Sequence, residues 1–136
     1  MNASEIEQLY EFTYFTIDEN TRGITREQSL VAPSPGGNCL NWVLGHIVAT
    51  RVPVLALAGA EPVWTAADAA IYRRGAAPLD AERITPEALA APGSPAVPGG
   101  LQPVGMQLGI LNFHEAYHAG QLGILRRLLG LPGVIR

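Results

Sequence analysis

Residues 92–103 constrain the fold of this 136-residue chain more than any other segment does. They contain four prolines and three glycines, and a proline inside a helix removes a backbone hydrogen bond and clashes with the preceding turn. The segment therefore cannot be helical, and it separates the N-terminal part of the chain from a last helix. We predict this last helix over residues 104–129, because Gly130 and Pro132 follow it as stop signals.

Two further long segments carry apolar residues at helical spacing. The first covers residues 4–20, and the second covers residues 39–58, with Asn38 as its N-cap and Pro53 as a point where it kinks or ends. Residues 65–91, where a fourth long helix would be expected, hold only short helical candidates. The two short candidates are residues 65–74 and 85–91. No strand pattern competes with these helices, so the sequence predicts one all-α domain over residues 1–136.

The composition excludes several classes of protein. The net charge is −3, and the nine basic residues form no stripe of the kind that nucleic-acid binding leaves, so we expect no nucleic-acid partner. The longest apolar stretch, residues 52–60, is far shorter than the ~20 residues that a membrane-spanning helix needs. The acidic N-terminus is unlike a signal peptide, and the single cysteine, Cys39, fits a reducing compartment. We therefore expect a cytoplasmic protein without a membrane partner.

Three histidines carry the main chemical signal: His46 in the second predicted helix, and His114 and His118 in the last one. His114 and His118 are four residues apart, so they share one helix face at the spacing with which two imidazoles grip one metal ion. A single histidine on an apolar face is usually a hydrogen-bonded core residue, but three inward histidines favour a metal site. Neutral imidazoles suit Zn²⁺, Ni²⁺ or Fe²⁺, and three protein ligands leave a position open for water or substrate.

The segment from His114 to His118 also matches the H-E-x-x-H signature of zinc proteases. We reject that interpretation because no histidine, glutamate or aspartate follows His118 to supply a third ligand. Glu115 points roughly 80° away from the bisector of the histidine pair, so we expect a second-shell or surface residue rather than a general base. Tyr117 and Gln121 are the other second-shell candidates, Gln121 as the acceptor for a ligating imidazole.

Two motifs make the sequence similar to the DinB/YfiT-like family of metal-binding four-helix bundles. Residues 38–46, Asn-Cys-Leu-Asn-Trp-Val-Leu-Gly-His, resemble the second-helix motif of that family, and residues 114–122, His-Glu-Ala-Tyr-His-Ala-Gly-Gln-Leu, resemble its last-helix motif. The resemblance implies an up-down four-helix bundle that holds a divalent metal with His46, His114 and His118. The sequence departs from the family in the third helix, which we expect to be shortened or irregular.

The resemblance also implies two alternative functions. Family members with an assigned reaction include thiol-dependent S-transferases and a maleylpyruvate isomerase. We therefore expect a metal-dependent enzyme of the S-transferase, isomerase or hydrolase type that acts on a small molecule, with a low-molecular-weight thiol as a further cofactor. The alternative is a non-catalytic metal-binding or interaction protein with a reduced substrate pocket. The shortened third helix favours the second function, whereas the open coordination position favours the first.

The outer face of the last predicted helix predicts a homodimer. Glu115 is the only charged residue between Val104 and Leu125, although a solvated helix face is normally charged. Glycine inside a helix costs roughly 1 kcal/mol relative to alanine, so several glycines there indicate a compensating close contact. These glycines are Gly105, Gly109, Gly120 and Gly123. We expect a second copy to make this contact through an isologous interface. The alternative is a monomer in which the proline-rich segment or the helix at residues 65–74 covers the face.

Overall fold

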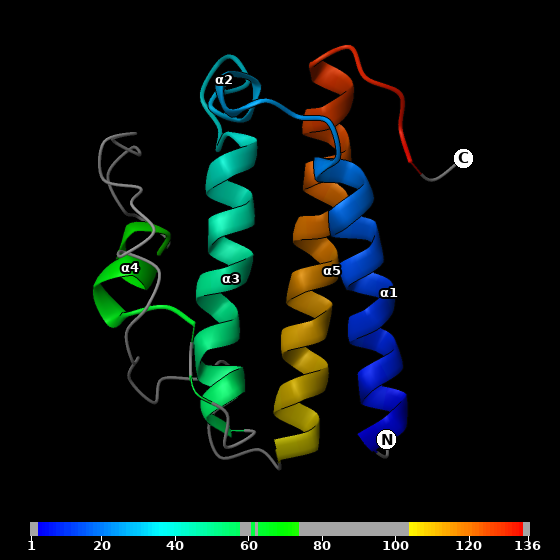
Figure 1. The fold of residues 1–136 in the computed structure, drawn as a ribbon, viewed down its shortest axis with the longest axis vertical. Coiled ribbons are helices and arrows are strands. Elements are labelled where there is room, and N and C mark those ends of the chain that lie inside the picture. The colour runs from blue at the N-terminus through cyan, green and yellow to red at the C-terminus, as the bar shows by residue number, and fades with distance from the viewer. Residues whose placement is uncertain (1–2, 58–60, 62, 74–103, 135–136) are drawn as a thin grey trace.

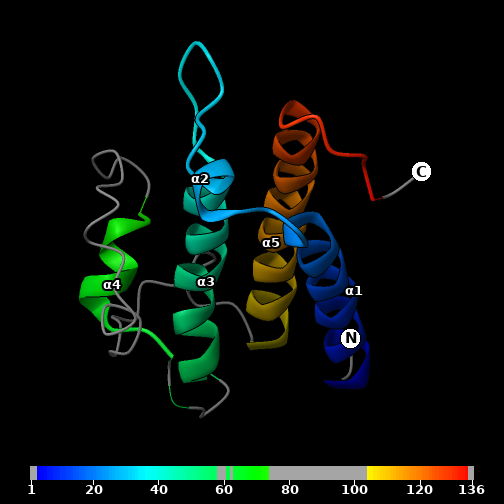
Figure 2. The same cartoon turned by 45° about the horizontal axis from the view of Figure 1, so that its top comes forward.

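Three long helices dominate the computed structural model, which describes residues 3–57, 61, 63–73 and 104–134. They are α1 (Ala3–Thr21), α3 (Leu40–Leu57) and α5 (Val104–Leu128), and α3 runs antiparallel to the other two (Figures 1 and 2). Of the two short helices, α2 (Arg26–Ser29) lies at the N-terminal end of α3 and α4 (Ala66–Ile71) lies beside α3 (Figure 1). The described residues contain no strand, so the all-α prediction is confirmed. None of the described helices is long and apolar enough to cross a membrane.

The predicted helices are present with small shifts at their ends. Pro53 lies inside α3, which continues as far as Leu57. The helix predicted from residue 65 is α4, and Thr65 and Asp68 form a reciprocal capping box at its start. The helical candidate at residues 85–91 and the proline-rich segment lie outside the described residues, so closure of a four-helix bundle stays a prediction.

α5 is the helix that joins the core together, because it contacts both α1 and α3. Leu122 of α5 is completely buried, and the same apolar cluster contains Ile17 from α1 and both Val43 and Ile47 from α3. α4 packs against α3 on the side away from α1 (Figure 1). The histidine-bearing faces of α3 and α5 therefore meet inside the packed part of the molecule.

Polar contacts fix the position of α5 along α1. Asn112 donates a hydrogen bond to Thr13 Oγ1 at 3.1 Å. The Arg126 guanidinium donates to the carbonyl oxygens of Asn20 and Arg22, at 3.3 and 2.7 Å, where α1 ends. A cation at a helix C-terminus is favourable because the last carbonyls point towards it. These bonds hold the ends of the two parallel helices together.

Gly45 allows α4 and the residue after it, Tyr72, to approach α3 closely. A Cβ atom at Gly45 would lie only 2.0 Å from Cε1 of Tyr72, so no larger residue fits without moving the ring. Tyr72 is buried, and its ring also contacts Trp64, with ring centroids 5.1 Å apart. This packing places the backbone of Tyr72 beside the residue that follows Gly45 in the sequence, which is His46.

Candidate metal centre

The three histidines of the chain converge between α3 and α5. One ring nitrogen from each of His46, His114 and His118 lies within 4.8 Å of those of the other two. His46 and His118 are buried and His114 is half-buried. The ring centroids are 4.4–5.2 Å apart. Among the described residues, this is the only group of histidine, cysteine and carboxylate side chains with such an arrangement.

The ring of His46 is oriented by its surroundings. Its Nδ1 lies 2.6 Å from the backbone carbonyl oxygen of Tyr72. A carbonyl oxygen only accepts hydrogen bonds, so Nδ1 carries the proton and Nε2 of the neutral ring carries the lone pair. Trp42, one turn earlier on α3, stacks on the same ring with a centroid distance of 4.9 Å. Both the tautomer and the plane of His46 are therefore fixed by neighbours.

The ring of His118 is oriented in the same way by Gln121. His118 Nδ1 lies 2.7 Å from Gln121 Oε1, so the lone pair of His118 is on Nε2. The amide of Gln121 in turn donates to the Tyr117 hydroxyl at 3.4 Å, and the Tyr117 ring contacts the His118 ring edge to face. The two residues expected beside the histidine pair are thus linked to it, although Tyr117 is 60% exposed.

The separation between the histidines of α5 fits a shared metal ion. Nε2 of His118 lies 3.1 Å from Nε2 of His114. Two imidazole nitrogens that bind one ion at about 2.0–2.1 Å with tetrahedral geometry lie about 3.3 Å apart. The same distance also suits a hydrogen bond donated by a protonated His114 Nε2, which is the hydrogen-bonded alternative of the sequence analysis. As metal ligands, His46 and His118 would both present Nε2, because their Nδ1 atoms have acceptors. In the hydrogen-bonded alternative, the lone pair of His118 Nε2 instead accepts the proton of His114.

Glu115 lies inside the molecule. Of the two positions that the sequence predicted, beside a metal ligand or on the surface, the surface position is wrong, because the residue is only 3% exposed. Both carboxylate oxygens accept hydrogen bonds from Arg51 of α3, from Nε at 2.8 Å and from a terminal nitrogen. Glu115 is the only charged residue of α5 before Arg126, and the ion pair with Arg51 neutralises it. The hydrogen bond to Glu115 also raises the pKa of Arg51.

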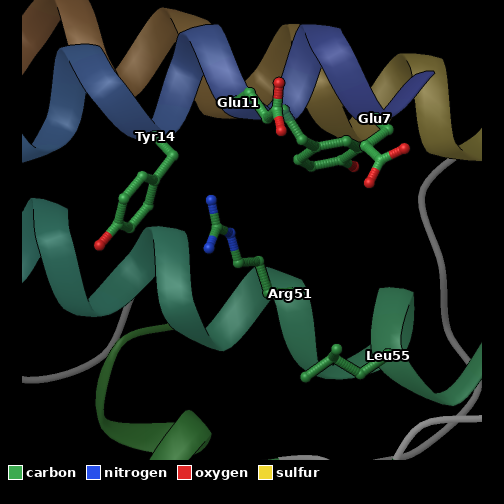
Figure 3. Close-up of a pocket in the computed structure, with 6 residues that line it drawn as sticks. Glu7, Glu11, Tyr14, Arg51 and Leu55 are labelled. Atoms are coloured by element: carbon green, nitrogen blue, oxygen red, sulfur yellow. The ribbon is translucent and has the colours of Figure 1, made fainter. Parts of the chain in front are cut away.

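A hollow of about 360 Å³ lies between α1 and α3, next to this ion pair (Figure 3). Arg51 and Leu55 form its α3 side, while two tyrosines and two glutamates line it from α1. The α1 residues are Glu7, Tyr10, Glu11 and Tyr14. The Tyr10 hydroxyl donates to the Leu108 carbonyl at 3.1 Å. Burial, followed by the charge of Glu115, raises the pKa of Tyr10 to about 12. No histidine lines this hollow, so it is separate from the metal centre.

Tyr72 and Arg51 are the residues around the centre that the sequence analysis missed. A signal for Arg51 was present, because it is the only charged residue in α3 and Glu115 is the only one in the first twenty-two residues of α5. Two isolated opposite charges in apolar helices indicate a buried pair. Tyr72 acts through its backbone carbonyl, which every residue possesses, so its side-chain identity carried no such signal.

Comparisons of the chain with protein-family models, with curated proteins and with solved structures give no match. Membership of the DinB/YfiT-like family therefore stays a prediction from the two motifs that end at His46 and begin at His114.

Proposed function

We propose that this protein binds one divalent metal ion through the Nε2 atoms of His46, His114 and His118. The observation that carries the proposal is the convergence of three imidazoles, two of which have their Nδ1 atoms beside acceptors. Ligating histidines commonly have such partners, because the second hydrogen bond fixes the ring and raises the basicity of the ligand nitrogen. The chain thus contains the ligands and the groups that orient them.

The donor set favours Zn²⁺ or Ni²⁺, with Fe²⁺ as a third candidate. Imidazole nitrogen suits all three ions, whereas Mg²⁺ and Ca²⁺ require oxygen ligands. The only carboxylate beside the pair on α5, that of Glu115, is engaged by Arg51. No acidic group is therefore part of the three-histidine cluster within the described residues, and the bound ion would keep its full positive charge.

We extend the proposal to a metal-dependent enzyme of the thiol-dependent S-transferase, isomerase or hydrolase type, as the resemblance to the DinB/YfiT-like family implies. A bound divalent ion would act as a Lewis acid and lower the pKa of a coordinated water or thiol. The chain itself supplies orientation and partial exclusion of water. Trp42 covers one side of His46, and Tyr117 and Gln121 are the polar groups that a small molecule would meet at the exposed edge.

A non-catalytic metal-binding protein is the second candidate, and one observation favours it. The only helix described between α3 and α5 is α4, which has six residues and packs against α3. A helix this short covers the side of His46 through Tyr72 but cannot form a long wall along α5. Such a protein would bind the ion with the same three histidines and would show no turnover.

Metal analysis of the purified protein, with variants of each ligand, tests the binding proposal. We expect one ion per chain in the wild type and loss of stoichiometric metal in His46→Ala, His114→Ala and His118→Ala. Asn112→Ala is the matched control, since it removes a buried hydrogen bond to Thr13 on the opposite face of α5 and leaves the histidines intact. A histidine variant that keeps the metal content of this control contradicts the site.

Assays of the loaded protein separate the two candidate functions. The enzyme proposal expects turnover of electrophiles with low-molecular-weight thiols, or hydrolysis of activated esters, that is lost on chelation and restored by the metal. Metal binding at full stoichiometry without turnover in either assay supports the non-catalytic alternative. The same histidine variants identify the site in both cases.

A further inference from the structure

The face of α5 that points away from α1 and α3 is apolar, and its described side chains are exposed. Its residues recur every three or four positions, and the large ones are among the most exposed side chains of the described chain: Phe113 is 75%, Tyr117 is 60% and Ile124 is 63% exposed. Ala116 and Gly120 lie between them on the same face and are also exposed. The packed residues of α5, such as Leu111 and Leu122, lie on the opposite face.

This face carries no charge over four helical turns. Glu115, the only charged residue of α5 before Arg126, is turned inward and paired with Arg51. The first charge on the outer face is Arg127, one turn beyond Gly123 and close to the end of the helix. A contiguous apolar patch of this kind marks an interaction site in a protein that exists in water.

We propose that this face forms a homodimer in which two α5 helices cross antiparallel about a twofold axis at Gly120. A Cβ at Gly120 would meet no atom within 4 Å in the same chain, so the glycine leaves space for a second backbone. In this arrangement residue i faces residue 240 − i of the other copy. Ile124 of each copy then faces Ala116 of its partner, and a large side chain fills the space above a small one.

Charge complementarity selects a second copy of this chain in the antiparallel direction. The twofold relation places the cationic Arg127 over the partner's Phe113, and a guanidinium over an aromatic ring is an attractive contact. A parallel pair would instead bring the two Arg127 side chains together. The surface is therefore self-complementary, which is the condition for an isologous contact.

The available area is sufficient for a specific dimer. A large apolar side chain buries about 150–250 Å² when it is covered completely. Given their exposed fractions, Phe113, Tyr117, Ile124 and Leu128 together offer roughly 500 Å² per copy. A standard interface buries about 800 Å² per partner, and the remainder would come from the small residues, Arg127 and the flanking side chains of α1. Phe12 is one of these flanking side chains and is 73% exposed. The next residue, Thr13, faces α5, and Tyr14 faces α3, so Phe12 points away from α3.

The interface would lie next to the candidate metal centre. Tyr117 belongs to the apolar face, yet its hydroxyl accepts a hydrogen bond from Gln121 and its ring contacts His118. Covering Tyr117 would hold this short chain of contacts in place and would form a wall beside the half-buried His114. The dimer itself requires no metal, so it stands or fails independently of the proposed metal binding.

Sedimentation velocity of the metal-free full chain between about 1 and 100 μM tests the dimer. We expect a species of twice the 14.4 kDa monomer mass. Phe113→Arg should weaken association at least tenfold, because it places two cations opposite each other, and Phe113→Glu should retain the dimer through an ion pair with Arg127. Combining Phe113→Arg with Arg127→Glu should restore association. Val63→Arg is the control, since Val63 is a comparably exposed apolar residue (66%) that lies just before α4, which packs against α3 on the side away from α1 (Figure 1).

Several outcomes would overturn the proposal. A wild-type monomer throughout this range means that the face is unpaired or is covered by another part of the same chain. An equal loss of association in Phe113→Arg and Phe113→Glu, or failure of the Arg127→Glu exchange to rescue, rejects the antiparallel twofold geometry. Gly120→Leu should also dissociate the dimer, and unchanged assembly in that variant rejects a crossing at Gly120. Far-UV circular dichroism of each variant verifies that the helices are intact.

Discussion

Replacing Gly45 with alanine tests whether the close approach of Tyr72 to α3 orients His46. The new Cβ would lie 2.0–2.4 Å from three ring carbons of Tyr72. The ring must therefore move, and the backbone carbonyl that accepts the His46 Nδ1 proton at 2.6 Å would move with it. An extra methyl group in a packed site costs about 1–3 kcal/mol, and overlap with three atoms places the cost at the upper end of this range. Alanine regains roughly 1 kcal/mol of helix propensity, which leaves a net loss of about 2 kcal/mol in the free energy of unfolding.

Two measurements follow the two parts of this argument. Urea unfolding of the metal-free protein reports the loss of stability, and calorimetric titration with Zn²⁺ reports the loss of orientation. Disturbing the partner of a ligating imidazole lowers metal affinity by about 10–100-fold, and we expect a decrease in this range for Gly45→Ala.

Gly123→Ala is the matched control in α5. Its Cβ would lie 3.4 Å from Asn20 Oδ1, which is an ordinary contact. The control should keep its zinc affinity and gain up to about 1 kcal/mol from helix propensity. Equal stability and equal zinc affinity in the two alanine variants would refute the conclusion that Gly45 positions Tyr72 and, through it, His46.

Three further predictions concern the groups around the centre. Arg51→Met leaves the Glu115 carboxylate buried without its partner and should lower the free energy of unfolding in urea by about 3 kcal/mol. The double variant Arg51→Met/Glu115→Leu should recover most of that loss. Equal stability of the single and double variants contradicts a buried ion pair. Gln121→Met removes the hydrogen-bond acceptor of His118 and should lower zinc affinity about 10–100-fold. Gln121→Glu keeps an acceptor and should retain the wild-type affinity. Identical zinc titrations of the two variants would show that Gln121 does not orient His118. Because the pKa of Tyr10 is raised to about 12 in the folded state, its contribution to stability should be complete below pH 10 and should disappear as the pH rises towards 12. Burial also raises the pKa of Tyr72, so ultraviolet titration of the tyrosinates should show late-titrating groups, of which one is absent from Tyr10→Phe.

The fold of the long helices and the histidine cluster could be predicted because both depend on spacing along single helices. Apolar residues at helical intervals define the buried side of α5 and place His114 and His118 on it. α3 is apolar around most of its circumference, so a residue of α3 such as His46 is predicted to be inside the molecule without a sharply defined face. Once two helices pack through their apolar faces, inward histidines at the same level along the two helix axes come together. The prediction therefore needed only the pattern and the assumption of a common core.

The partners of the histidines followed this rule only in part. Gln121 is one turn from His118, so helical spacing predicted their proximity. The partner of His46 is Tyr72, 26 residues away and just after α4. Tyr72 can approach His46 only because Gly45 has no side chain. The pairing of Arg51 with Glu115 likewise depends on the relative height of α3 and α5, which periodicity within each helix leaves undetermined.

The three imidazoles come from two helices that are far apart in the sequence, so a bound ion would link distant parts of the chain. His114 is 68 positions after His46, and an ion held by both would act as a reversible crosslink that closes this long loop in the chain. The entropy of closing a flexible loop grows only with the logarithm of its length, so insertions or deletions in the intervening segment would change the crosslink energy little. An ion at a concentration one hundred times its Kd would stabilise the folded chain by about 2.7 kcal/mol. Metal supply would then add to the packing that holds α3 and α5 together, and the sequence between Tyr72 and α5 could diverge while the centre is retained.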